Sequence, residues 1–156
     1  MVGEVQVAAA KAAGWHGWLW KMRLHQAQAE MAIARGDADA ALVLAGETLD
    51  RSQATGRVKY QAAALGVRAR ALLLTGRKHD AILALQDAVM RVRPMKDPAL
   101  LFRTIAALLD VEPTQALARE AAGLAEQIRT ALEDALLRSS FEDSAPARLV
   151  ARLGTA

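Results

Sequence analysis

Two stretches of the chain share a spacing of glycine and alanine that decides the fold: ARGDADAALVLAGETLD at residues 34–50 and LTGRKHDAILALQDAVM at residues 74–90. With Gly36 set over Gly76, 40 residues further on, one alanine stands seven residues before each glycine and another five residues after it. Glycine ends helices because it adopts the left-handed conformation without a steric penalty, and small residues let paired helices approach closely. The pattern predicts two helical hairpins, each closed at a glycine turn.

The small residues of these two units are Ala29 with Ala69 and Ala41 with Ala81. A third, weaker unit is aligned with Val111 at the place of the glycine, 35 residues after Gly76. In this alignment Ala116 matches Ala41, and Thr104 stands where Ala29 and Ala69 stand in the first two units. Units of this length are typical of helical-hairpin solenoids.

Helical periodicity runs through almost the whole chain, and no segment alternates as a strand does. The composition agrees, since 36 residues are alanine and only six are aromatic. Asp37 or Asp39 is expected to cap the second hairpin helix, and Asp143 or Ser144 the last helix. The sequence predicts an all-α protein with helices at about 4–13, 18–35, 38–55, 58–75, 78–92, 98–110, 111–138 and 144–153.

These helices are assigned to one domain that covers residues 1–156. Its predicted units are residues 18–56, 57–96 and 97–137, followed by the terminal helix at about 144–153.

The alanines at positions 29, 41, 69 and 81 and the turn glycines at 36 and 76 resemble the tetratricopeptide repeat. The family's usual Trp and Tyr in the first helix and Pro at the end of the second are missing from these units. The degenerate form is similar to the C-terminal arrays of large bacterial signalling proteins, which carry an ATPase, cyclase, kinase or LuxR-type DNA-binding portion upstream. Those portions have no counterpart here, so the resemblance implies a non-catalytic interaction or regulatory module.

In this family the first helix of each hairpin lines the concave groove. The resemblance therefore implies a groove for a protein or peptide, or for a small molecule that is sensed there. The family's carboxylate clamp is not reproduced. Arg23, Arg70 and Arg103 could bind an acidic segment through charge-assisted hydrogen bonds, or could simply solvate the groove. The candidate groove residues are Arg23, Gln26, Glu30, Ile33, Ala63, Gly66, Arg70 and Leu73.

Aromatic residues gather near the N-terminus, where Trp15 and Trp18 can share a helical face with Met22. One interpretation is that they cover the first hairpin against the N-terminal helix. The other is that they form a contact surface for an upstream repeat or for a second copy of the chain, because an uncapped solenoid end exposes an apolar face. The second interpretation predicts a homo-oligomer.

No pattern of residues indicates catalysis or metal binding. The three histidines lack a metal-spaced partner, cysteine is absent, and no phosphate-binding loop or nucleophile motif occurs. Glu133 with Asp134, and Glu142 with Asp143, are neighbours in sequence and do not face one another on a helix, so they are read as solvated or capping groups. The sequence predicts a protein that is not an enzyme and that has no cofactor.

The net charge of +3 is unevenly distributed, because residues 57–103 carry +7, residues 1–56 carry −1 and residues 104–156 carry −3. A basic middle segment raises the alternative of a nucleic-acid-binding helical protein. Its basic residues are spread over several helices, however, and solvated helix faces explain them as well. No signal peptide or membrane-spanning run is recognised, so a cytoplasmic protein is expected.

Overall fold

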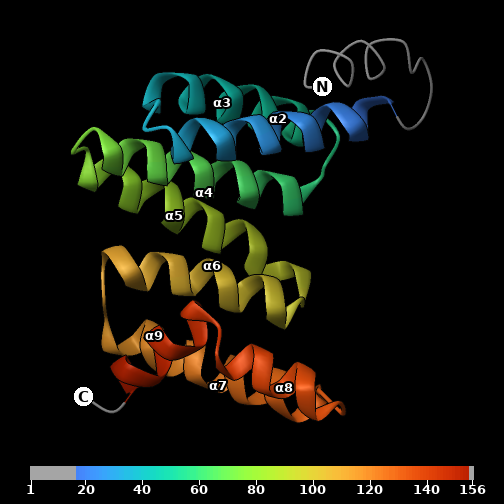
Figure 1. Ribbon diagram of the computed structural model, residues 1–156, viewed down its shortest axis with the longest axis vertical. Coiled ribbons are helices and arrows are strands. Elements are labelled where there is room, and N and C mark those ends of the chain that lie inside the picture. Colours follow the sequence, from blue (N-terminus) through green and yellow to red (C-terminus); the bar gives the residue numbers. More distant parts are fainter. Residues whose placement is uncertain (1–16, 155–156) are drawn as a thin grey trace. The chain divides into compact units, whose positions relative to one another are not determined.

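The computed structural model describes residues 17–154, except for the side chain of Trp18, and in this range the chain is entirely helical (Figure 1). The helix predicted at residues 4–13 lies outside the described residues. The elements are α2 (Gly17–Ala34), α3 (Ala38–Ala54), α4 (Val58–Leu74), α5 (Lys78–Val92), the 3-10 turn η1 (Arg93–Met95), α6 (Pro98–Val111), α7 (Gln115–Ala131), α8 (Ala135–Glu142) and α9 (Ala145–Gly154).

The chain divides into two compact units, Met1–Ala81 and Ile82–Ala156, and the boundary falls inside α5. In the first unit α3 packs against both α2 and α4, and α2 also contacts α4. In the second unit α7 contacts α6, α8 and α9, and α9 also contacts α6 and α8. The all-α fold class predicted from the sequence is confirmed, and helices that follow one another in the chain pack together within each unit.

Glycine turns of one design join the helices of the first unit. Gly36, Gly56 and Gly76 have φ values of 75°, 64° and 74°, a conformation that costs glycine little and other residues more. In the first turn the amide of Gly36 donates to Ile33 O at 3.0 Å, and the next amide donates to Ala32 O at 2.9 Å. The same two bonds close the turns at Gly56 and Gly76. The three glycines are 20 residues apart, so the turn recurs once per helix.

Side-chain caps begin several helices at the predicted places. Asp37 Oδ1 accepts a hydrogen bond of 3.0 Å from the amide of Ala40 and caps α3. Ser144 Oγ accepts from the amide of Ala147 at the start of α9, at 3.4 Å. Both predictions had left a second candidate open, and the structure selects Asp37 over Asp39 and Ser144 over Asp143.

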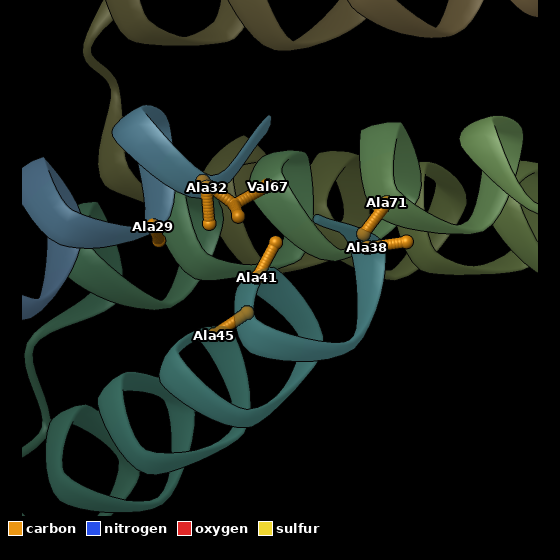
Figure 2. Close-up of a cluster of buried hydrophobic side chains, with 7 residues drawn as sticks. All are labelled: Ala29, Ala32, Ala38, Ala41, Ala45, Val67 and Ala71. Atoms are coloured by element: carbon orange, nitrogen blue, oxygen red, sulfur yellow. The ribbon is translucent and has the colours of Figure 1, made fainter. Parts of the chain in front are cut away.

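Alanine forms most of the contact between the helices of the first unit. Ala29, Ala41, Ala69 and Ala81, the four small residues that define the sequence repeat, are each at most 1% exposed. Figure 2 shows Ala41 of α3 directed toward Ala32 of α2 and Val67 of α4, with Ala38 beside Ala71. Because these side chains are short, the helix backbones approach closely, as the repeat predicted.

Larger side chains fill the core of the second unit. Phe102, Ile105 and Leu109 of α6 are buried, as is Val150 of α9. The ring of Phe102 also packs against that of Phe141 in α8, with centroids 5.4 Å apart and planes tilted by 56°. Unlike the alanine contact of the first unit, this core depends on bulky residues.

The predicted placement of Val111 at a turn does not agree with the helix boundaries. Val111 is the last residue of α6 and not the turn, and Ala116 is exposed although it was aligned with buried Ala41. Thr104 is buried, and its hydroxyl donates to Leu100 O at 2.7 Å.

Two buried alanines flank the connection between α6 and α7 at the same spacing that flanks Gly36 and Gly76. Ala106 and Ala118 are 2% and 3% exposed, and they lie seven residues before and five residues after Pro113. Pro113 lies in the connection between α6 and α7, 37 residues after Gly76.

The segment 111–138, predicted as one helix, forms two helices in the structure. α7 ends at Ala131, and Asp134 starts α8 by accepting hydrogen bonds of 2.7 Å and 3.1 Å from the amides of Leu136 and Leu137. The guanidinium of Arg138 donates to Leu132 O at 2.7 Å and holds the break. The helical propensity of the segment hid the break, although Asp134 had been considered as a capping group.

We expect Ala41→Leu to lower the free energy of unfolding by about 1–3 kcal/mol, because the larger side chain overpacks a contact without free volume. Ala54→Leu is the matched control, since Ala54 is exposed on the same helix and its substitution should change stability by less than about 0.5 kcal/mol. Urea unfolding followed by circular dichroism measures both. If the two variants lower the free energy of unfolding equally, the helices are not in close contact at Ala41.

Candidate functional site

The eight candidate groove residues lie on α2 and α4, the two helices of the first unit that also contact each other. None of the eight is buried. Arg23, Glu30, Arg70 and Leu73 are exposed, and Gln26, Ile33, Ala63 and Gly66 are partly exposed. We call these residues, together with Tyr60, the α2/α4 face.

Two polar contacts across the α2/α4 face tie the helices together. Arg70 Nη2 of α4 lies 2.5 Å from Glu30 Oε1 of α2, and both side chains are about half exposed. Arg23 Nε of α2 donates to the hydroxyl of Tyr60 on α4 at 3.3 Å. The structure therefore places Arg23, Glu30 and Arg70 on the same two helices, within or beside these two contacts.

The Arg70–Glu30 and Arg23–Tyr60 pairs differ in the charge that the arginine can offer to a binding partner. Arg70 is neutralised by Glu30, so the predicted binding of an acidic segment by Arg70 competes with an ion pair inside the chain. Arg23 is bonded to a neutral phenol and keeps its positive charge. Arg103 is exposed on α6 in the second unit.

Two residues with small side chains, Ala63 and Gly66, lie between the two polar pairs on α4. Tyr60, Ala63, Gly66 and Arg70 follow one another at helical spacing and therefore lie on one side of α4. A Cβ atom added at Gly66 would meet no atom within 4 Å outside the helix backbone, so the space above it is open. The two residues with the smallest side chains thus lie between Tyr60 and Arg70.

The sequence contained a signal for one of these contacts that was not used. Arg70 follows Glu30 by 40 residues, which is the spacing of the repeat. Residues at the same repeat position of adjacent hairpins face each other, so opposite charges at that spacing predict an ion pair. Tyr60 carried no such signal, because its contact with Arg23 spans 37 residues and joins non-equivalent positions.

His25 lies on the other side of α2, toward α3. Its Nδ1 atom is 3.3 Å from Glu47 Oε2, yet this buried nitrogen makes no hydrogen bond within the described residues. Burial lowers the pKa of His25 below 6.5, and Arg51 and Lys21 lower it further, whereas Glu47 opposes the shift. Burial outweighs the carboxylate, so the neutral imidazole is favoured in the folded protein.

We expect the first unit to lose stability in mild acid because of His25. The unfolded chain binds the proton more tightly than the folded one, so the free energy of unfolding falls as the pH drops through 6.5 toward the lowered pKa. Urea unfolding between about pH 7.5 and about pH 5.5 measures the loss, which His25→Gln should reduce. The exposed His79 is the control. If His79→Gln reduces the loss equally, the assignment to His25 is wrong.

The predicted self-association surface is not assembled by the described residues. Trp15 lies outside them, and Trp18 contributes only its backbone, in α2. Met22 is 1% exposed and is a core side chain, not a surface one. Trp20, which the prediction did not include, is 57% exposed.

The basic segment 57–103 carries much of its charge in ion pairs. Four of its ten basic residues lie within ion-pair distance of carboxylates, in the pairs Arg70–Glu30, Arg77–Asp80, Arg91–Asp87 and Arg93–Glu120. Two of these carboxylates, Glu30 and Glu120, lie outside the segment. The excess of +7 counted along the sequence is therefore partly compensated in space.

Within residues 17–154, no group of three or more His, Asp or Glu side chains is arranged to hold a metal ion. In the same range, no helix combines the length and the apolar character that crossing a bilayer requires.

Comparison with known proteins identifies no relative of this chain: no family model, no curated protein and no solved structure matches it.

Proposed function

We propose that this chain is a tetratricopeptide-like array of helical hairpins that acts as a non-catalytic protein-interaction module, with the α2/α4 face as its binding surface. The buried alanines carry this proposal. Small residues lie seven positions before and five positions after each of Gly36, Gly76 and Pro113, and all six are buried. A hairpin repeat requires small residues there because its helices must approach closely.

The α2/α4 face supports binding because its groups are held in place before a partner arrives. The Glu30–Arg70 and Arg23–Tyr60 contacts fix four side chains on packed helices. A preorganised surface loses little conformational entropy on binding. Ala63 and Gly66 leave room between the pairs for a peptide backbone to approach α4 closely.

The chemistry of the face indicates which peptide would fit. Arg23 offers a cationic group for a carboxylate of the partner, and Ile33 and Leu73 offer apolar surface further along the helices. The Glu30–Arg70 pair presents both signs of charge and favours a polar segment between these ends. We therefore propose a peptide or protein partner with an acidic group and an apolar residue at opposite ends of the contact. In this proposal the chain exerts its regulatory effect by binding that partner at the α2/α4 face.

Nucleic-acid binding is less well supported than protein binding. The charge of the basic segment is partly compensated by Glu30 and Glu120 from two other helices and by Asp80 and Asp87 within the segment. Phosphate binding needs several cations without such compensation on one surface.

Gly66→Arg tests the α2/α4 face, because the added side chain enters open space and obstructs the region between the two polar pairs without disturbing the core. The matched control is Gly46→Arg. Gly46 is also inside a helix of the first unit with open space around it, but it lies on α3. Both variants should be at least as stable as the parent, because arginine favours a helix over glycine by roughly 0.5–1 kcal/mol.

The measurement is affinity capture from a bacterial lysate by the parent and both variants, with captured proteins quantified by mass spectrometry. We expect proteins captured by the parent to be lost with Gly66→Arg, by about tenfold or more, and retained with Gly46→Arg. If capture is unchanged by Gly66→Arg, or lost equally with both variants, the α2/α4 face is not the binding surface.

A further inference from the structure

The second unit contains a hollow of about 420 Å³ between α7, α8 and α9. Its walls are largely apolar, formed by alanines of α7 and α9 together with Val150 and the ring of Phe141. Val150 is buried, and Phe141 is held in place by its contact with Phe102. The hollow therefore has a fixed apolar floor, and its volume is in the range of small-molecule sites.

Three charged residues also line the hollow: Glu126, Arg129 and Glu142. Arg129 Nε and Nη2 donate to the two carboxylate oxygens of Glu126 at 2.8 Å and 2.6 Å. This hydrogen bonding lowers the pKa of Glu126 and raises that of Arg129, so the pair stays ionised and neutralises itself.

Glu142 gives the three charged residues of the hollow a net negative charge. Arg129 is paired with Glu126, and the charge of Glu142 is the last of the four influences on the pKa of Arg129. Glu142 follows Phe141 directly, and both residues line the hollow. An aromatic ring and a carboxylate at one site are the two groups that attract an organic ammonium ion, through the π-face and through charge.

We propose that the hollow between α7, α8 and α9 binds a small organic cation: an apolar alkyl or aryl body that contacts Phe141, Val150 and the alanine walls, with an ammonium head at Glu142. A carboxylate ligand is disfavoured because Glu142 would repel it and Arg129 is already occupied by Glu126. This site lies in the second unit and does not depend on the α2/α4 face.

Three probes with one body and different heads test the charge of the ligand: 3-phenylpropylammonium, 3-phenylpropanol and 3-phenylpropanoate, each titrated into the whole chain at neutral pH. Chemical-shift changes at Ala125, Phe141 and Val150 report binding, and the resonances of α2 serve as the internal reference. We expect the cation to bind about fivefold more tightly than the alcohol, the size expected of one exposed ion pair or cation–π contact. The carboxylate should bind more weakly than either.

Two variants with one control test the site. Glu142→Gln should abolish the preference for the cation over the alcohol, whereas Glu133→Gln, at an exposed glutamate that does not line the hollow, should leave it unchanged. Ala125→Leu should fill the hollow and weaken all three probes, and urea unfolding of the free variant shows that it remains folded.

Several outcomes would overturn the proposal: no probe binds, all three heads bind equally, Glu133→Gln has the same effect as Glu142→Gln, or Ala125→Leu leaves binding intact in a folded protein. The solution mass is measured with and without the cation. A dimer that the cation dissociates would show that a second copy, and not a small ligand, occupies the hollow.

Discussion

The closeness of the helices in the first unit is the constraint on which its other features depend. Ala29, Ala41 and Ala71 are at most 1% exposed and belong to one cluster with Val67, so α2, α3 and α4 meet across small side chains. A helix that packs this closely against its neighbour cannot slide along its own axis or rotate about it without a steric clash, because protein interiors are close-packed. This rigidity brings Glu30 and Arg70 within ion-pair distance although each side chain is about half exposed. The α2/α4 face is thus a consequence of the alanine contact behind it.

Most of the helix boundaries were predictable because they depend on local chemistry. A glycine at positive φ and a capping carboxylate act over a few residues, so the sequence predicted the turns at Gly36 and Gly76 and narrowed the cap of α3 to Asp37 or Asp39. The end of α6 was harder to predict, because the connection between α6 and α7 contains no glycine. The break before α8 was missed since the residues around Asp134 favour a helix, and only the tertiary setting shows that it ends.

The family resemblance supplied the candidate residues, and only the structure shows their contacts. The resemblance placed Arg23, Glu30 and Arg70 at groove-lining positions, and in the structure they lie on the surface of the first unit. The Glu30–Arg70 pair follows the 40-residue spacing of the sequence pattern, whereas the Arg23–Tyr60 contact joins non-equivalent positions and depends on the relative stagger of two helices. The hollow near Phe141 was not predictable from the sequence, because residues of three separate helices, α7, α8 and α9, line it.

The turn glycines of the first unit recur every 20 residues, and each turn is closed by the same pair of backbone hydrogen bonds. Since these bonds involve no side chain, the turn imposes no condition on the helices that it joins. A gene segment encoding two helices and two turns, about forty codons, can therefore be duplicated or deleted without altering any remaining turn. A single inserted codon inside a helix would instead rotate every later side chain by about 100° and bring the alanines out of the contact. The length of such a protein can thus change in whole hairpins far more readily than in single residues.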